Sequence, residues 1–307
     1  MNSTIYYRNR HSKQLQRLKK ARTGAWVNIE NLEQQDLETL AEHYQLEANI
    51  LRDALDPYEV PRIERDEGKT YLFTRFAYQV DGTSFTAPLL IVIGPKLLFT
   101  ISTKPLPATA RFDAGLIDFY TTQKTKLLIQ LFLEINQDYQ RLINQMSKTI
   151  RNLGFRLEEI ENKDVTRFVQ YESVFNDFIF GLEPMSITLQ KLLSGKFVPL
   201  FEEDKELIED LFLGTDQLLK IAISNIKASK NIREAYSSIQ SNNLNKTMKL
   251  LTSITVILTV PTVIASFWGM NVPLPFEAQQ YGFVWLAILM FAVSAGLWAF
   301  FSKKDLL

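Results

Sequence analysis

The chain has 307 residues, with 34 basic and 34 acidic side chains and no cysteine. Zero net charge argues against a dedicated nucleic-acid binder, and the lack of cysteine excludes a disulfide framework, a thiolate metal site and a cysteine nucleophile. Charges are frequent up to about Lys249, whereas from Leu250 onward the only charged residues are Glu277, Lys303, Lys304 and Asp305. This distribution predicts a soluble part followed by a membrane part.

The N-terminal region, 1–110, has the pattern of an α/β domain. A strand is predicted at 24–31 and helical runs at 33–43 and 47–55. More strands are predicted where β-branched and aromatic residues gather between glycine turns, at 71–78, 89–93 and 96–101. A basic stretch, interpreted as a solvated loop or sheet edge, contains Arg8, Arg10, Lys13, Arg17, Lys19, Lys20 and Arg22. The N-terminus has no apolar run typical of a secretory signal, so we expect this domain in the cytoplasm.

Residues 111–248 have the spacing of packed antiparallel helices. Breaks are predicted at Gly154, at 181–184 and at Gly195. Between Pro199 and Pro261 there is no proline and only one glycine, so a single helix is predicted from about Asp204 into the membrane. At 1.5 Å per residue it would be roughly 90 Å long or more, which suits a stalk leading to a pore.

The C-terminal region, 249–307, is predicted to be a transmembrane hairpin. Two apolar runs, 251–268 and 281–301, approach the length needed to cross a bilayer. Lysines flank the outer ends of both runs, and the loop between them has no lysine or arginine. The positive-inside rule therefore places both termini in the cytoplasm.

Polar side chains follow one face of the first span. Two helices cannot enclose a water-filled path, so transport would require several subunits around an axis. Taking 100° per residue, about a third of the helix circumference collects the polar residues, and with Leu251 these form the predicted pore lining: Asn245, Met248, Leu251, Thr252, Thr255, Thr259, Thr262 and Ser266. The alternative is that the hydroxyls bond carbonyls of their own helix or join helices together.

The first span ends in Trp268 and is followed by Gly269-Met270-Asn271. At the mouth of the first of two C-terminal spans, this tripeptide is specific, and the chain resembles the CorA family of magnesium transport proteins. The resemblance is close from Asp210 to the basic tail and looser at 60–64 and 71–73. It implies a long helical stalk, a funnel-shaped homopentamer in the cell membrane, and a selectivity ring of Asn271 carbonyls that contacts hydrated Mg²⁺.

The resemblance also implies roles for residues around this motif. Gly269 would permit close approach of backbones, and Met270 would pack. Glu277 resembles the acidic residue of the family's external loop and could concentrate cations, although an exposed loop carboxylate of no special role is an equal alternative.

Regulation by cytosolic Mg²⁺ is a further implication of the resemblance. In the family, the ion bridges neighbouring subunits through acidic residues, and Asp210 and Glu234 align with the positions on the long helix. The N-terminal partner is replaced here by Gln79, with Asp81 nearby, and this departure puts the sensor in doubt. The alternative for Asp210 and Glu234 is a solvated helix face.

The expected function is therefore transport of hydrated Mg²⁺ into the cytoplasm along the membrane potential, with no organic cofactor. An enzyme is disfavoured because the sequence lacks a glycine-rich phosphate loop and a nucleotide fingerprint. A carrier of the same family for Zn²⁺, Co²⁺ or Ni²⁺ is the alternative, and a membrane-anchored scaffold is a third. The absence of cysteine and the presence of only His11 and His43 favour a hard, hydrated ion.

Overall fold

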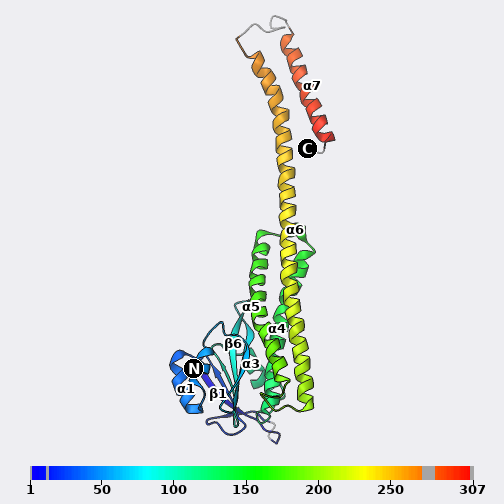
Figure 1. Ribbon diagram of the computed structural model, residues 1–307. Helices are drawn as coiled ribbons and strands as arrows, with labels where there is room; N and C mark the ends of the chain where they lie inside the picture. The colour runs from blue at the N-terminus through cyan, green and yellow to red at the C-terminus, as the bar shows by residue number, and fades with distance from the viewer. Residues whose placement is uncertain (1, 12–13, 272–280, 305–307) are drawn as a thin grey trace. The chain divides into compact units, whose positions relative to one another are not determined.

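The computed structural model describes residues 2–11, 14–271 and 281–304 (Figure 1). The chain divides into two compact units, Met1–Ile232 and Arg233–Leu307. Each unit is described by itself below. The three-part division predicted from composition, at 110 and at 248, stays a prediction.

The first unit is built on a mixed sheet of seven strands in the order β2-β1-β3-β7-β6-β5-β4. The strands β3 and β7 are parallel, and every other neighbouring pair is antiparallel. Their bounds are Asn2–Tyr7 (β1), Gln16–Leu18 (β2), Trp26–Glu30 (β3), Arg62–Asp66 (β4), Lys69–Val80 (β5), Thr83–Ile93 (β6) and Leu98–Ser102 (β7). The predicted strands at 24–31, 71–78, 89–93 and 96–101 are confirmed as β3, β5, β6 and β7.

The basic N-terminal stretch belongs to the sheet edge, as one of its two interpretations stated. β2 is the outermost strand, and it pairs with β1, which the sequence did not predict. Arg17 of β2 reaches Asp113 at 2.9 Å, and Arg8 reaches Asp118 at 2.9 Å. Charged side chains on a short edge strand discourage pairing with another chain.

Helices cover both faces of the sheet. One face packs against the 3-10 helix η1 (Gln34–Asp36), α1 (Leu37–Tyr44) and α2 (Ala48–Asp53), which confirms the helical runs predicted there. The other face packs against α3 (Pro107–Asp113), α4 (Lys124–Gly154) and α5 (Asn162–Leu192). The side chain of Trp26 is fully buried, and its indole donates to Thr100 Oγ1 at 2.8 Å.

The helices α4, α5 and the start of α6 (Glu202–Trp268) complete the first unit, and α4 and α5 run antiparallel in Figure 1. Asn136 of α4 donates to Thr215 Oγ1 at 2.8 Å, and Asn225 of α6 donates to Ser147 Oγ at 2.8 Å. These amide contacts fix how α4 and α6 lie against each other.

The predicted helix break at 181–184 is wrong, because α5 continues through Pro184. The buried face of α5 explains why: Gly181, Leu182 and Met185 are buried, and a Cβ atom at Gly181 would lie 2.7 Å from the hydroxyl of Tyr139. Packing against α4 and the sheet therefore outweighs the local preference of glycine and proline to end a helix.

A buried ionic cluster ties α3 to α4. Arg111 bonds the carboxylates of Glu134 (2.6 Å) and Asp138 (2.8 Å). Each of these acidic residues exposes only 3% of its surface. Burial of two carboxylates is tolerated because one guanidinium bonds both of them.

The second unit consists of the rest of α6 and of α7 (Gly282–Lys303). The prediction of one uninterrupted helix from about Asp204 is confirmed by α6. Both helices are long and apolar enough to cross a membrane, and almost none of their apolar windows is buried.

Candidate functional site

The predicted pore lining lies on an open face of α6. All eight of its members are exposed. The partly or fully covered residues lie nearly opposite on the helix circumference: Ser253, Val256, Ile257, Val260, Pro261 and Ile264. The polar face is therefore exposed within the single chain, as are apolar residues such as Leu258 and Phe267. Its first members line a groove together with Phe301 of α7.

The hydroxyls of this face bond within the helix. The donations are Thr255 to the Leu251 carbonyl (2.8 Å), Thr259 to Thr255 (2.7 Å), Thr262 to Leu258 (2.8 Å) and Ser266 to Thr262 (2.7 Å). These bonds match the first part of the alternative considered above, in which the hydroxyls bond carbonyls of their own helix. It has a chemical consequence, because a hydroxyl that has donated its proton presents only oxygen lone pairs outward.

The Gly269-Met270-Asn271 tripeptide closes α6. The amide of Gly269 donates to the Ala265 carbonyl at 3.1 Å, and Met270 and Asn271 are exposed. A Cβ atom at Gly269 would make only ordinary contacts within this chain, at 3.5 Å or more. The close backbone approach expected at Gly269 is therefore not a requirement of the single chain. Glu277 lies outside the described residues.

The predicted regulatory carboxylates lie on separate elements. Asp210 is exposed on α6 in a groove against α4, Glu234 is exposed further along α6, and Asp81 lies at the tip of the β5–β6 hairpin. Among the residues that the structure describes, no three acidic or histidine side chains gather in a way that could hold a metal ion. The intersubunit sensor stays a prediction.

The hairpin tip has a two-residue turn. Asp81 and Gly82 both have positive φ angles, 49° and 79°, and Val80 pairs with Thr83. Such a turn matches the twist of the flanking strands and requires residues that tolerate the left-handed conformation. Gln79, the departure from the family pattern, donates to Ser84 Oγ at 3.4 Å across this hairpin.

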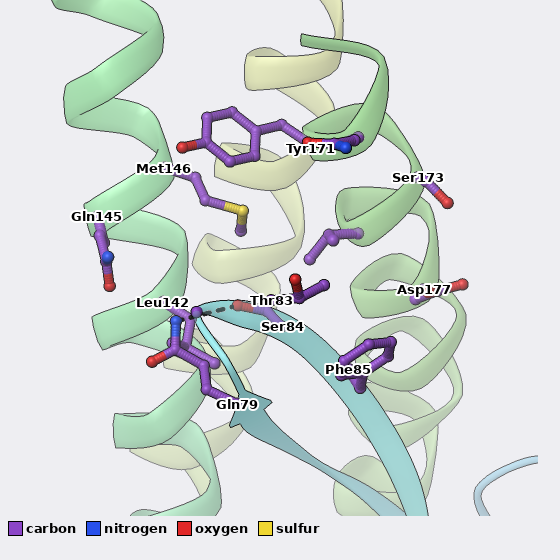
Figure 2. Close-up of a pocket in the computed structure, with 13 residues that line it drawn as sticks. Gln79, Thr83, Ser84, Phe85, Leu142, Gln145, Met146, Tyr171, Ser173 and Asp177 are labelled. Atoms are coloured by element: carbon purple, nitrogen blue, oxygen red, sulfur yellow. Dashed lines mark hydrogen bonds between the residues drawn. The ribbon is translucent and has the colours of Figure 1, made fainter. Parts of the chain in front are cut away.

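A pocket of about 280 Å³ lies between this hairpin tip, α4 and α5. Figure 2 shows the side chains that line it. Its polar lining includes the amides of Gln79, Gln145 and Gln170 and the carboxylate of Asp177, and Met146 supplies part of its apolar wall. No sequence pattern predicts this pocket, because its residues come from three segments far apart in the chain.

Asp177 is the charged member of the pocket. Partial burial raises the pKa of its carboxyl above the ordinary value, and the attraction of Arg75 opposes this rise. The Arg75 guanidinium is buried and donates to Thr86 Oγ1 at 3.0 Å and to the Glu59 carbonyl at 3.0 Å. The pocket can therefore form hydrogen bonds with a small polar molecule.

A mixed-sheet domain, a helix of 67 residues and two apolar helices define the class of an integral membrane protein with a large domain before its spans. Residues 22–304 match the model of the CorA-like Mg²⁺ transporter proteins. The chain belongs to this family, whose members are membrane transporters.

Individual relatives agree with this assignment. The chain is 27% identical to the cobalt/magnesium transport protein CorA of Methanocaldococcus jannaschii, over 91% of this chain and 90% of the relative. It is 23% identical to the protein of the same name from Thermotoga maritima, over 92% of this chain and 83% of the relative. The solved complete structure of the Methanocaldococcus jannaschii CorA magnesium transporter superposes with a TM-score of 0.85 at 22% identity, covering 100% of this chain and 99% of that chain.

Proposed function

We propose that this chain forms a homopentamer in the cell membrane that admits hydrated Mg²⁺ to the cytoplasm, with both termini on the cytoplasmic side. Transport of Mg²⁺ by the family supports the substrate. The membrane potential supplies the drive, since a divalent cation moving inward gains roughly 4.6 kcal/mol per 100 mV.

The observation that carries the proposal is the open polar face of α6. Its hydroxyl protons are donated to carbonyls of the helix, so the face offers oxygen lone pairs outward. Water bound to Mg²⁺ points its protons away from the ion, and Mg²⁺ gives up that water reluctantly. Several copies of this face around an axis would accept hydrogen bonds from the hydrated ion without stripping it, and the absence of charge there would let the ion leave again.

Selectivity is assigned to Asn271, because its amide carbonyl is an acceptor that follows directly on the open face. Asn271→Ala is expected to abolish Mg²⁺ uptake by purified protein in liposomes while the oligomer stays intact. Asn243→Ala is the matched control, because Asn243 is an exposed asparagine on the opposite side of α6. Normal uptake by the Asn271→Ala protein would remove the central claim.

The same liposomes test the choice of metal. Curated relatives carry the words cobalt and magnesium in their names, so Co²⁺ is the specific rival, with Zn²⁺ and Ni²⁺ as further arms. Uptake of Mg²⁺ at physiological concentrations that is unaffected by trace Co²⁺ supports Mg²⁺ as the substrate. Uptake of Co²⁺, Zn²⁺ or Ni²⁺ with none of Mg²⁺ would reassign the protein to that metal.

Feedback by cytosolic Mg²⁺ is the regulatory part of the proposal. An ion that bridges Asp210, Glu234 or Asp81 to a neighbouring subunit would hold the subunits in a closed arrangement, and its loss would shift a two-state equilibrium toward opening. Asp210→Asn combined with Glu234→Gln should flatten the dependence of currents on internal Mg²⁺, whereas Glu209→Gln, an exposed neighbour, should not. Unchanged inhibition in the double variant would mean that these carboxylates form only a solvated face.

A further inference from the structure

Basic side chains gather at one end of the first unit. This basic cluster consists of six residues, all at least partly exposed: Arg10, Lys19, Lys20, Arg22, Lys96 and Lys124. Among the residues that the structure describes, none of the six forms an ion pair with a carboxylate. Elsewhere in the unit, Arg62 and Arg111 are each held by two or three carboxylates. The positive charge of the basic cluster is therefore not neutralised by neighbouring side chains.

Contacts between segments far apart in the sequence hold these cations at one place. The amide of Gly24 donates to the carbonyl of Lys96 at 2.7 Å. A Cβ atom at Gly24 would lie only 2.9 Å from Cγ2 of Thr122, so the loop 19–24 is pressed against the start of α4. The amide of Arg8 donates to Thr121 Oγ1 at 3.0 Å, which brings the end of β1 to the same place. The basic cluster is therefore a single surface.

Two of the cations are oriented by neutral groups. The guanidinium of Arg22 lies over the ring of Tyr7, 3.3 Å from the ring centroid. The guanidinium of Arg10 donates to the side-chain oxygen of Gln123 at 2.6 Å. These neighbours fix the direction of each guanidinium without cancelling its charge. Less side-chain entropy is then lost when an anion binds.

The chemistry of the basic cluster fits a short anion with several charges. Guanidinium groups present N–H donors in a fixed fork that matches the oxygens of phosphate, and the lysines add further positive charge. Two ion pairs border the cluster, Arg8 with Asp118 and Arg17 with Asp113, both at 2.9 Å. The side chain of Asp118 is 75% exposed. Its charge would repel a long polyanion such as a nucleic acid that extended beyond the cluster.

The position of the basic cluster in the unit favours a soluble anion over a lipid headgroup. The helix α4 begins at Lys124, in the cluster, and ends at Gly154, about 45 Å away at 1.5 Å per residue. A Cβ atom at Gly154 would lie 3.0 Å from Ile232 of α6, the last residue of the first unit. The helix α6 therefore leaves the unit, toward its apolar span, at the end opposite the cluster.

We propose that the basic cluster binds a soluble oligophosphate, either a nucleoside triphosphate or inorganic tripolyphosphate, through its phosphate oxygens. Arg10 and Arg22 supply the oriented donors, and the lysines supply additional attraction. Mg²⁺ also binds such phosphates and cancels two of their negative charges. The metal-free anion is therefore the form that the cluster prefers. This binding does not depend on which cation the protein carries.

Isothermal titration calorimetry of the full-length protein tests this proposal, with ATP and sodium tripolyphosphate as probes at constant ionic strength without Mg²⁺. Arg10→Gln combined with Arg22→Gln should raise the Kd of both anions about tenfold, because charge-assisted hydrogen bonds are lost. The matched control, Arg156→Gln combined with Lys220→Gln, removes the same charge from exposed positions outside the cluster. It should leave both Kd values unchanged. Excess Mg²⁺ should weaken the binding of either anion to the parent protein.

Further arms separate the sources of phosphate. Equal affinity for the two probes would assign recognition to the phosphate chain, and tighter binding of ATP would add the nucleoside. Tighter binding of a short single-stranded RNA than of either probe would overturn the proposal in favour of a nucleic-acid surface. Absence of binding to the parent, equal weakening in the cluster and control variants, or binding that Mg²⁺ does not weaken would also overturn it.

A second variant covers the case in which Arg10→Gln with Arg22→Gln fails to fold. Lys19→Gln combined with Lys20→Gln changes two exposed lysines of the cluster. This variant should raise both Kd values several-fold at an unchanged unfolding temperature. Parent-like Kd values in that protein would overturn the proposal.

Discussion

The two units of the chain place their apolar side chains in opposite ways. In the first unit, residues such as Trp26, Phe73 and Leu90 are fully or almost fully buried between the sheet and its helices. In the second unit, large apolar residues such as Phe267, Phe291 and Trp298 are exposed to between 59% and 78%. The first unit completes its own core, whereas the second needs lipid or other copies to cover it.

The polar groups follow the same contrast. The buried carboxylates of Glu134 and Asp138 are bonded by Arg111 in the interior of the first unit. In the second unit the hydroxyls lie on the surface of α6 and donate to its backbone. The comparison predicts that substitutions in the core of the first unit change its free energy of unfolding. Substitutions on the open face of α6 should instead change how that face contacts water.

The largest expected effect concerns labelling of the open face. Single cysteines in place of Thr255, Thr259 or Thr262 should react with small water-soluble thiol reagents, because we expect this face to line the pore. A cysteine at Ile257 should not react, because that position is covered, and one at Leu258 should not react, because it is expected to face lipid. The chain has no native cysteine, so each label reports one position. Equal labelling at all five positions would mean that the polar face is structural.

A large effect on stability is expected from Arg111→Ala. Removing the guanidinium leaves the buried carboxylate of Glu134 without its cation and leaves Asp138 with only the exposed Arg141 at 3.6 Å. The loss should lower the free energy of unfolding of the first unit by about 3 kcal/mol. Trp26 is the only tryptophan of this unit, so its fluorescence during urea denaturation follows the unit once Trp268, Trp285 and Trp298 are replaced by phenylalanine.

The matched control for Arg111→Ala is Lys126→Ala. The pair of Lys126 and Glu203, at 3.3 Å, is exposed, and such pairs contribute at most about 1 kcal/mol. Equal losses in the two variants would show that the buried cluster is not the special contact described above.

The smallest expected effect is a pH-dependent gain from Asp177→Asn. Asp177 is exposed at the pocket, and partial desolvation raises the pKa of its carboxyl above the ordinary value of 3.8. Its neutral form therefore favours the fold below that value, and this contribution is lost as the pH rises through the raised pKa. The variant should unfold at a slightly higher temperature than the parent at pH 7. The difference should vanish below pH 3.8, and a lower unfolding temperature at pH 7 would show that attraction to Arg75 outweighs burial.

Strong periodic patterns made much of the fold predictable from sequence. Uninterrupted apolar and helical runs gave α6 and α7, and alternating β-branched residues gave β5, β6 and β7. The strand β1 (Asn2–Tyr7) was not predicted because the start of its sequence is polar. It is part of the sheet because it pairs with β3, which is a contact between distant segments. The predicted helix break at Gly181 was wrong because the packing of Gly181 against Tyr139 is a tertiary contact, which no local sequence pattern contains.

The candidate site was predictable only where it lies on one helix. The polar residues of this face recur with the helical period, so the sequence alone predicted the face. The structure shows that these residues are exposed. The pocket beside Gln79 and Asp177 combines a hairpin tip with two helices.

The order of the elements along the chain has a consequence for biosynthesis. All seven strands lie within the first 102 residues, including the parallel pair β3 and β7. The ribosome adds about 5–20 residues per second, so roughly 7–30 s separate the synthesis of Ser102 from that of Leu250. All strands of the sheet can therefore pair before the first apolar span emerges. No strand then has an unpaired edge in the cytosol while the membrane hairpin is inserted.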